Sequence, residues 1–315
     1  MPLAAWRGLS GRRFRAASAF EDIGKICALL LAVFFSVTVA WGQDRTRILL
    51  VVAHPDDEYY FAATVYRLAV QLNAQVDEVV ITDGEGGYRY STLAEPYYRK
   101  SLTVESVGRK ELPAIRRKET INAGRILGIN RHIFLNQKDQ RFTTDEEEGL
   151  RGGWNTSLIL SRISDLLKRA HYQFIFCILP RSTTHGHHQA AAALAATAAH
   201  NLPQDLRPVL LGFDTDANRF TPAANLPGPQ QWSGSYAYVF DRTTSFGFHR
   251  ALNYQIVVDW MIAEHKSQGL LQTWCEKDTS EYIWIDEGSS SRARAKAQLL
   301  FSHLNQQSTK PLVVP

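Results

Sequence analysis

Two clusters of histidine and carboxylate side chains have the composition of a metal site. The first consists of His54, Asp56 and Asp57, which follow directly after the apolar run from Ile48 to Ala53. Neighbouring carboxylates repel one another and lose hydration when they are partly buried, so a stable fold needs a positive charge beside them. A bound metal ion is the simplest source of that charge.

The second cluster lies further along the chain, in "LPRSTTHGHHQAA". It holds His185, His187 and His188, a few residues after the apolar run Phe174–Leu179. Two imidazoles and a carboxylate are the usual ligands of a hydrolytic zinc ion, which keeps a fourth position for water. Each cluster alone also has a structural explanation, as hydrogen-bonded histidines or as acidic residues at a helix start. Their combination favours a metal site, and the absence of any C-x-x-C excludes a thiolate zinc site.

The elements that position these clusters follow from the alternation of two patterns. Apolar runs bounded by turn residues predict strands, and the segments of helical periodicity between them predict helices. This alternation predicts a Rossmann-like α/β fold, a mostly parallel sheet with helices on both faces. The predicted strands are Ile48–Ala53, Val76–Thr82, His132–Asn136, Phe174–Leu179 and Val209–Phe213, with later runs from Ser235 and from Glu281; the predicted helices are Phe61–Leu72, Arg117–Leu127, Ser157–Ala170, Gln189–His200 and Phe248–His265.

The fold class predicts where the two clusters meet. Open parallel sheets bind ligands at the carboxyl ends of their strands, so the clusters face one crevice if their two strands are parallel neighbours. Two long segments, Tyr88–Pro113 and Pro222–Pro229, are predicted to be loops that shape a pocket.

Composition excludes some classes of function. The 315 residues are 45% hydrophobic, which suits one large α/β domain. The formal net charge is only +4 and the basic residues are scattered, so nucleic acid is not an expected partner. The densest basic stretch, Arg109–Lys118, is predicted to be a solvated loop and helix start.

The N-terminal residues resemble an export signal. Several arginines precede an apolar run from Ile26 to Trp41, and small residues stand at Ala40 and Gly42. We therefore predict a signal peptide at residues 1–42, a single domain at 43–315, and a secreted or periplasmic protein. The apolar run is roughly 16 residues, shorter than the ~20 that cross a bilayer comfortably, so an uncleaved membrane anchor is the second possibility.

The three cysteines do not predict a disulfide. Cys27 would leave with the signal peptide, while Cys177 lies in a strand-like run and Cys275 in a polar context far along the chain. We expect a buried thiol at Cys177 and a surface thiol at Cys275.

Six motifs of the sequence resemble those of one enzyme family. They are AHPDDE (residues 53–58), TDGEGG (82–87), RRKETINAGRILGI (116–129), FLNQKD (134–139), HGHH (185–188) and HKSQ (265–268). From about Arg47 to Leu270 the chain resembles the LmbE-like or PIG-L family of zinc-dependent N-acetylglucosaminyl deacetylases. The resemblance implies the LmbE-like deacetylase fold, a bound Zn²⁺, and removal of an N-acetyl group from an amino sugar or glycoconjugate.

The resemblance also implies roles for five residues. His54, Asp57 and His188 match the metal ligands of the family, Asp56 matches the general base, and His185 matches the residue thought to polarise the carbonyl. This agrees with elementary chemistry, because zinc lowers the pKa of its bound water and a nearby carboxylate can accept the proton as the water attacks the amide.

Residues for substrate binding are less sharply predicted. Arg116, in the R-x-x-E position with Glu119, either fixes a hydroxyl or phosphate of the substrate or is a charge on a helix surface. Glu85 and Tyr88, in and after the glycine-rich GEGG, are assigned to substrate binding through close backbone approach and an aromatic face. Asp139 is a further substrate contact, a partner of a histidine, or a loop cap. Other aromatic residues that suit a sugar ring, or that simply pack, are Tyr90, Tyr97, Tyr98, Trp154 and Trp232.

The sequence departs from the family in two places. Gly186 and His187 stand where relatives commonly have Pro-Asp, and Thr183 stands where some relatives carry a tyrosine proton donor. The catalytic acid therefore stays unassigned. Two alternatives to a sugar deacetylase also stay open, namely an amide hydrolase on a non-sugar substrate and a secreted carbohydrate-binding protein with an inactive site.

Overall fold

The computed structural model describes residues 45–218, 228–274, 277–286, 288 and 291–305. The predicted signal peptide, Cys275 and most of the predicted loop at residues 222–229 lie outside these ranges. Among the described residues, no helix has both the length and the apolar character to cross a bilayer. Cys177 is a buried free thiol, as predicted.

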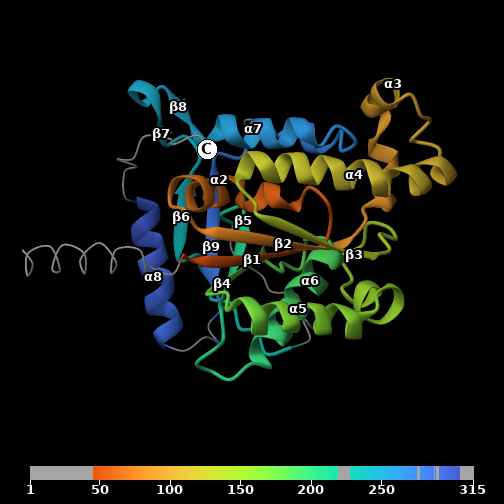
Figure 1. Cartoon of the computed structure of the whole chain (residues 1–315). Coiled ribbons are helices and arrows are strands. Elements are labelled where there is room, and N and C mark those ends of the chain that lie inside the picture. Colours follow the sequence, from red (N-terminus) through yellow and green to blue (C-terminus); the bar gives the residue numbers. More distant parts are fainter. Residues whose placement is uncertain (1–44, 219–227, 275–276, 287, 289–290, 306–315) are drawn as a thin grey trace, which may run out of the picture. The chain divides into compact units, whose positions relative to one another are not determined.

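Seven strands of the described chain form one mixed sheet in the order β3-β2-β1-β4-β5-β9-β6 (Figure 1). The first five strands in this order run parallel. At one edge β9 pairs antiparallel with both β5 and β6, so β6 runs in the same direction as the first five. The predicted mostly parallel sheet is therefore confirmed. The strands are β1 (Arg47–Val52), β2 (Gln75–Thr82), β3 (Arg131–Gln137), β4 (Phe174–Ile178), β5 (Val209–Asp214), β6 (Tyr238–Asp241) and β9 (Ser280–Ile285), with a separate small pair β7 (Ser245–Phe246) and β8 (Leu252–Asn253).

Helices cover both faces of the sheet (Figure 1). The helices are α2 (Ala62–Tyr66), α3 (Glu95–Tyr98), α4 (Glu105–Leu127), α5 (Thr156–Ala170), α6 (Gly186–His200), α7 (Tyr254–Glu264) and α8 (Ser291–Asn305). Short helical turns complete the described elements: η1 (Asp57–Phe61), η2 (Arg67–Gln71), η3 (Glu85–Tyr90), η4 (Thr92–Ala94), η5 (Glu148–Gly153), η6 (Phe248–Arg250) and η7 (Leu271–Trp274).

The alternating side chains of β1 show why the strand is apolar throughout. Ile48 and Leu50 point into a core formed with α2, α4, α7 and α8, whereas Leu49 and Val51 point into a second core formed with α5 and α6. A strand that is buried on both faces needs apolar residues at every position. This buried strand is followed closely by His54, which lines a cavity.

Helix α4 begins well before the predicted start at Arg117. The predicted loop from Tyr88 to Pro113 is wrong, because this segment contains three short helical elements and the first turns of α4. The prediction of a solvated loop at the basic stretch is also wrong. Pro113 lies inside the helix, where a proline costs roughly 3 kcal/mol. Burial of Leu112 and Ile115 against other apolar side chains outweighs that local preference.

The boundaries of two other helices differ from the prediction for identifiable reasons. Helix α6 begins at Gly186 because His185 caps it, its Nδ1 accepting the His187 backbone N–H at 3.0 Å. His187 and His188 are therefore in the first turn of a helix. Helix α7 begins only at Tyr254, where the Asn253 side chain caps the first turn.

Candidate metal centre

The two histidine clusters meet at one edge of the sheet because their strands are parallel neighbours. Strand β1 pairs with β4 in parallel register, with Leu50 opposite Phe176. The loop after β1 therefore lies against the N-terminus of α6, which follows β4. This is the crevice that the fold class predicted.

Three side-chain atoms form a nearly regular triangle in this crevice. Nδ1 of His54 lies 3.1 Å from Nε2 of His188 and 3.6 Å from Oδ1 of Asp57, and the His188–Asp57 distance is 3.1 Å. Ligands about 2.0–2.1 Å from a tetrahedral zinc ion are separated by about 3.3 Å. These three residues, the predicted metal ligands, therefore fit a zinc-sized cation with one position left open.

Backbone hydrogen bonds fix the orientation of the Asp57 carboxylate. Its Oδ2 accepts the N–H groups of Ala53 and His54 at 2.9 and 2.8 Å, which leaves Oδ1 facing the histidines. Burial alone would raise the pKa of Asp57, but His188 and His54 beside it bring that pKa well below its usual range. The carboxylate is thus ionised and ready to bind a cation.

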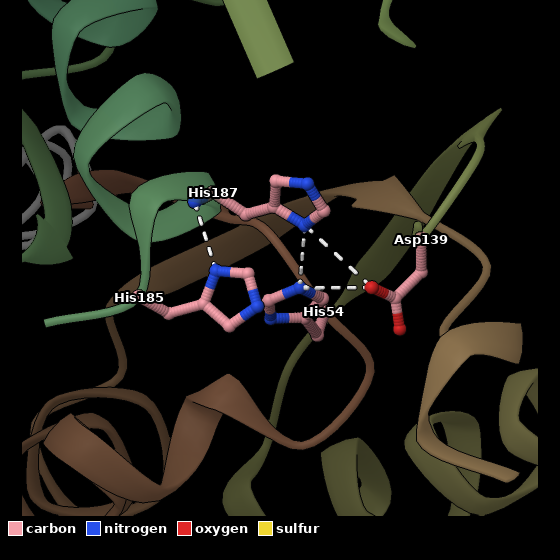
Figure 2. Close-up of side chains that lie close together, drawn as sticks. All are labelled: His54, Asp139, His185 and His187. Atoms are coloured by element: carbon pink, nitrogen blue, oxygen red, sulfur yellow. Dashed lines mark hydrogen bonds and ion pairs between the residues drawn. The ribbon is translucent and has the colours of Figure 1, made fainter. Parts of the chain in front are cut away.

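The other ring nitrogen of His54 faces a second group of side chains (Figure 2). Its Nε2 lies 3.1 Å from Nδ1 of His187 and 3.7 Å from Oδ1 of Asp139, and that Asp139 oxygen is 3.6 Å from the same His187 nitrogen. An imidazole that binds a metal through Nδ1 carries its proton on Nε2, and a partner at that nitrogen fixes the ring. Asp139 therefore lies beside a histidine, one of the positions the sequence predicted for it.

His185 presents a hydrogen-bond donor to the cavity. Because its Nδ1 accepts the His187 backbone N–H, the neutral ring carries its proton on Nε2. Burial, reinforced by the nearby His54 and His188, lowers the pKa of His185 far below the usual value, so the ring is neutral. The predicted role of a donor outside the metal ligands suits this geometry.

Asp56 differs from its neighbour Asp57 in both environment and backbone. Its side chain lines the cavity, and burial together with the adjacent Asp57 raises its pKa to about 7. Its backbone has φ 120° and ψ −12°, in the left-handed region that residues other than glycine rarely adopt. A carboxylate with such a pKa can exchange a proton near neutral pH.

The cavity has a volume of about 370 Å³. Besides the two clusters, its walls contain apolar and aromatic side chains that the sequence analysis did not single out, except for Tyr90. They are Tyr60, Tyr90, Phe142, Leu270, Leu271 and Trp274. Only the position of Tyr60, two residues after the AHPDDE motif, could have been inferred from its neighbours. Phe142 comes from a loop and Leu270 and Trp274 from beyond α7, where no sequence pattern links them to the site.

Arg116 is buried, so the proposed helix-surface charge is wrong. Its guanidinium lines the cavity and donates hydrogen bonds to the carbonyls of Gly84 and Gly87 and to Oε1 of Gln268. These contacts tie the glycine-rich turn to the HKSQ motif. Arg116 thus has a structural role through these hydrogen bonds, and substrate binding by Arg116 stays a prediction.

Two predicted substrate residues do not line the cavity. Tyr88 packs against apolar residues that include Leu102 and Leu112, and Glu85 accepts the backbone N–H of Asp139 at 2.9 Å. The glycines of this turn do reach the cavity: a Cβ at Gly86 would lie 2.6 Å from the Asp139 carbonyl oxygen. The turn needs glycine because other groups of the protein approach it closely. The sequence had instead suggested a close approach of the substrate. The other named aromatic residues, Tyr97, Tyr98, Trp154 and Trp232, do not line the cavity either.

The two departures from the family pattern have defined positions. His187 is fully buried, with its ring against that of Trp154 at 4.9 Å between centroids. Thr183 lines the cavity, and Thr184 Oγ1 lies 3.4 Å from Nδ1 of His188. Neither threonine carries an acidic proton, so the catalytic acid is not found at the place where some relatives carry a tyrosine.

A protein family and several known proteins are similar to this chain in sequence. The model of the PIG-L family, described as GlcNAc-PI de-N-acetylase, matches residues 49–199. Two relatives named probable N-acetyl-alpha-D-glucosaminyl L-malate deacetylase 2 are similar in sequence. The one from Bacillus subtilis is 25% identical, covering 56% of this chain and 70% of its own, and the one from Bacillus cereus is 23% identical, covering 65% and 82%.

A solved structure has a similar fold. The deacetylase of the A40926 pseudoaglycone superposes with a TM-score of 0.51 at 16% identity, over 79% of this chain and all of that one. The family model covers both histidine clusters and the strands that carry them. Residues 49–199 therefore match the PIG-L family of de-N-acetylases, the family that the motifs resemble.

Proposed function

We propose that this protein is a zinc-dependent N-deacetylase that removes the acetyl group of an N-acetylglucosamine-type sugar or conjugate. The observation that carries the proposal is the triangle of His54, Asp57 and His188, whose sides of 3.1–3.6 Å suit zinc and which opens on a cavity. The names of the two Bacillus relatives, which specify an N-acetylglucosaminyl conjugate, support the substrate class.

The residues around the triangle divide the work of amide hydrolysis. A zinc ion held there would supply Lewis-acid chemistry and lower the pKa of a water molecule. Asp56 accepts the proton of the attacking water, since its side chain lines the same cavity and has a pKa near neutrality. His185 donates its Nε2–H to the developing negative charge on the carbonyl oxygen, a contribution typically worth about 10²–10³ in rate.

The apolar part of the cavity favours a substrate that carries more than a bare sugar. Tyr90, Phe142 and Leu270 are all substantially exposed, and each also lines the cavity. Such surfaces at the mouth of a pocket are typical of binding sites for apolar groups. This feature also keeps the second candidate, an amide hydrolase acting on a non-sugar substrate, in consideration.

An inactive carbohydrate-binding protein fits the site less well. Such a protein needs neither a zinc-sized triangle nor a second carboxylate and a neutral histidine beside it. Asp56 and His185 both line the cavity with the residues of the triangle, and this arrangement supports turnover in preference to binding alone.

The test combines metal analysis with product detection. Purified protein, loaded with zinc and dialysed, should retain about one zinc per chain, the content of a single three-ligand site. It should then release acetate from N-acetylglucosamine, from its alkyl glycosides, or from both. Turnover confined to N-acetylated amines without a sugar would favour the second candidate. Retained zinc with no acetate from any of these compounds would favour the binding protein.

A further inference from the structure

The HKSQ motif, which the proposed mechanism does not use, contacts the AHPDDE loop. His265 follows α7 and is completely buried, and so is Glu58. Nε2 of His265 lies 2.6 Å from Oε1 of Glu58, although the two residues are more than two hundred positions apart. A buried carboxylate is costly unless it is paired and hydrogen-bonded, so this contact holds Glu58 in one orientation.

The second oxygen of Glu58 reaches the backbone of Asp56. Its Oε2 accepts the Asp56 N–H at 3.1 Å, while Oε1 is engaged by His265. One buried carboxylate thereby joins the imidazole of the HKSQ motif to the backbone amide of the residue that we propose as general base.

The backbone of Asp56 needs such support. Its φ of 120° is strained for a residue with a Cβ, and such a conformation is unfavourable by itself. It persists only where surrounding contacts enforce it. The contacts on either side are the Glu58 oxygen at the Asp56 N–H and the Tyr59 N–H, which donates to the Asp56 carbonyl at 3.1 Å.

A second residue of the same motif touches the loop from the other side. Nε2 of Gln268 lies 3.4 Å from the carbonyl oxygen of Pro55, the residue before Asp56. Oε1 of Gln268 accepts a hydrogen bond from Arg116 at 2.8 Å. The HKSQ segment therefore contacts the loop on both sides of the strained residue, at Pro55 and at Glu58.

We propose that His265 is a positioning residue for the carboxylate of Asp56, acting through Glu58. The imidazole fixes Glu58, Glu58 fixes the Asp56 amide, and the strained backbone directs the Asp56 side chain into the cavity. The proposal rests on the proposed role of Asp56 as general base, and it assigns a function to a motif that contributes no atom to the metal triangle.

The chain offers a matched control for the test. Nδ1 of His132 lies 2.7 Å from Oε2 of Glu78, another buried carboxylate. Glu78 interacts electrostatically with Glu58 and His265, but the described Glu78 and His132 side chains make no hydrogen bond to the Asp56 backbone. His265→Leu and His132→Leu each remove one such imidazole and leave a carboxylate unpaired. His265→Gln keeps an N–H donor for Glu58.

Kinetics separate positioning from general support of the fold. With the methyl glycoside of N-acetylglucosamine, His265→Leu should lower kcat roughly 10- to 100-fold, the scale of a misplaced reacting group. KM and zinc content should stay near the parent values, His265→Gln should recover most of kcat, and His132→Leu should lower only thermal stability. Added to Asp56→Asn, His265→Leu should change kcat by no more than about two-fold, because no carboxylate is left to position. The same loss in both backgrounds, or loss of zinc with kcat, would overturn the proposal.

A crystal structure decides the question independently of activity. In metal-free His265→Leu, the φ of Asp56 should move out of the left-handed region and its carboxylate should leave the cavity. A φ that stays near 120° contradicts the proposal even if kcat falls. If neither the parent protein nor any variant releases acetate, the proposed function fails, while the crystal structure still decides whether His265 positions Asp56.

Discussion

His54 and His187 face each other through Nε2 and Nδ1 at 3.1 Å, deep in the site. A metal-binding histidine usually has a carboxylate, carbonyl or water at its second nitrogen, and here an imidazole is the closest partner. Removing such a partner typically costs about 10–100-fold in metal affinity. His187→Ala should therefore weaken zinc binding by that factor, measured by competition with a chromophoric chelator. Unchanged affinity would mean that Asp139 alone orients His54. His171→Ala, at the exposed C-terminal end of α5, is the control.

Asp56 and Asp57 are adjacent but should respond differently to mutation. Asp57→Ala should lose most of the zinc and all turnover, because it removes one of three ligands. Asp56→Asn should keep its zinc and bind substrate similarly while turning over about 10²–10⁴-fold more slowly, the scale of general-base loss. Zinc content and acetate release of both variants decide the assignment. A metal-free Asp56→Asn together with a zinc-loaded Asp57→Ala would reverse it.

His185 should affect turnover but not metal content. As a neutral donor outside the triangle, its replacement by alanine should leave zinc stoichiometry near the parent value and lower kcat about 10²–10³-fold. Metal analysis beside steady-state kinetics measures both quantities. Loss of zinc in His185→Ala would show that His185 and His188 exchange roles.

The pH dependence of stability should report the Glu58–His265 pair. Burial alone would lower the pKa of His265, but Glu58 raises it to about 9. Because this value lies above that of the unfolded chain, the stabilisation is complete below about pH 6.5 and is lost as the pH rises through about 9. The free energy of unfolding of the metal-free protein should therefore fall by about 1–3 kcal/mol more across this interval than that of His265→Gln.

Urea denaturation at several pH values measures this difference. The pKa of His54 is also raised to about 9, by Asp139 and Asp57 against the effect of burial, but it changes both proteins alike. Parallel curves for the parent protein and His265→Gln would show that the pair is not ionised in the native state.

The N-terminal segment should be removed on export. If residues 26–41 act as a signal, mature protein should begin at or near Gln43 and appear outside the cytoplasm. N-terminal sequencing of the exported fraction tests this. An intact N-terminus in washed membranes would instead establish the anchor that the sequence left as the second possibility.

Much of the site could be predicted because it lies at the ends of strongly apolar strands. The run into His54 and the run before His185 both gave correct strands, and the parallel sheet places their ends together. Helix α4 could not be delimited, because Pro113 and the surrounding charges conceal a start at Glu105 that tertiary burial enforces. Tyr88 was assigned to the substrate for lack of any signal that would place it in a small core.

Asp56, the proposed general base, has a φ of 120°, a backbone conformation that is unfavourable for stability. Glycine would adopt this backbone without a Cβ penalty, but it has no carboxylate to accept a proton. The chain therefore retains a locally unfavourable conformation at this position. If His265 enforces it as proposed, the effects of substitutions at positions 56 and 265, far apart in the sequence, should not be additive.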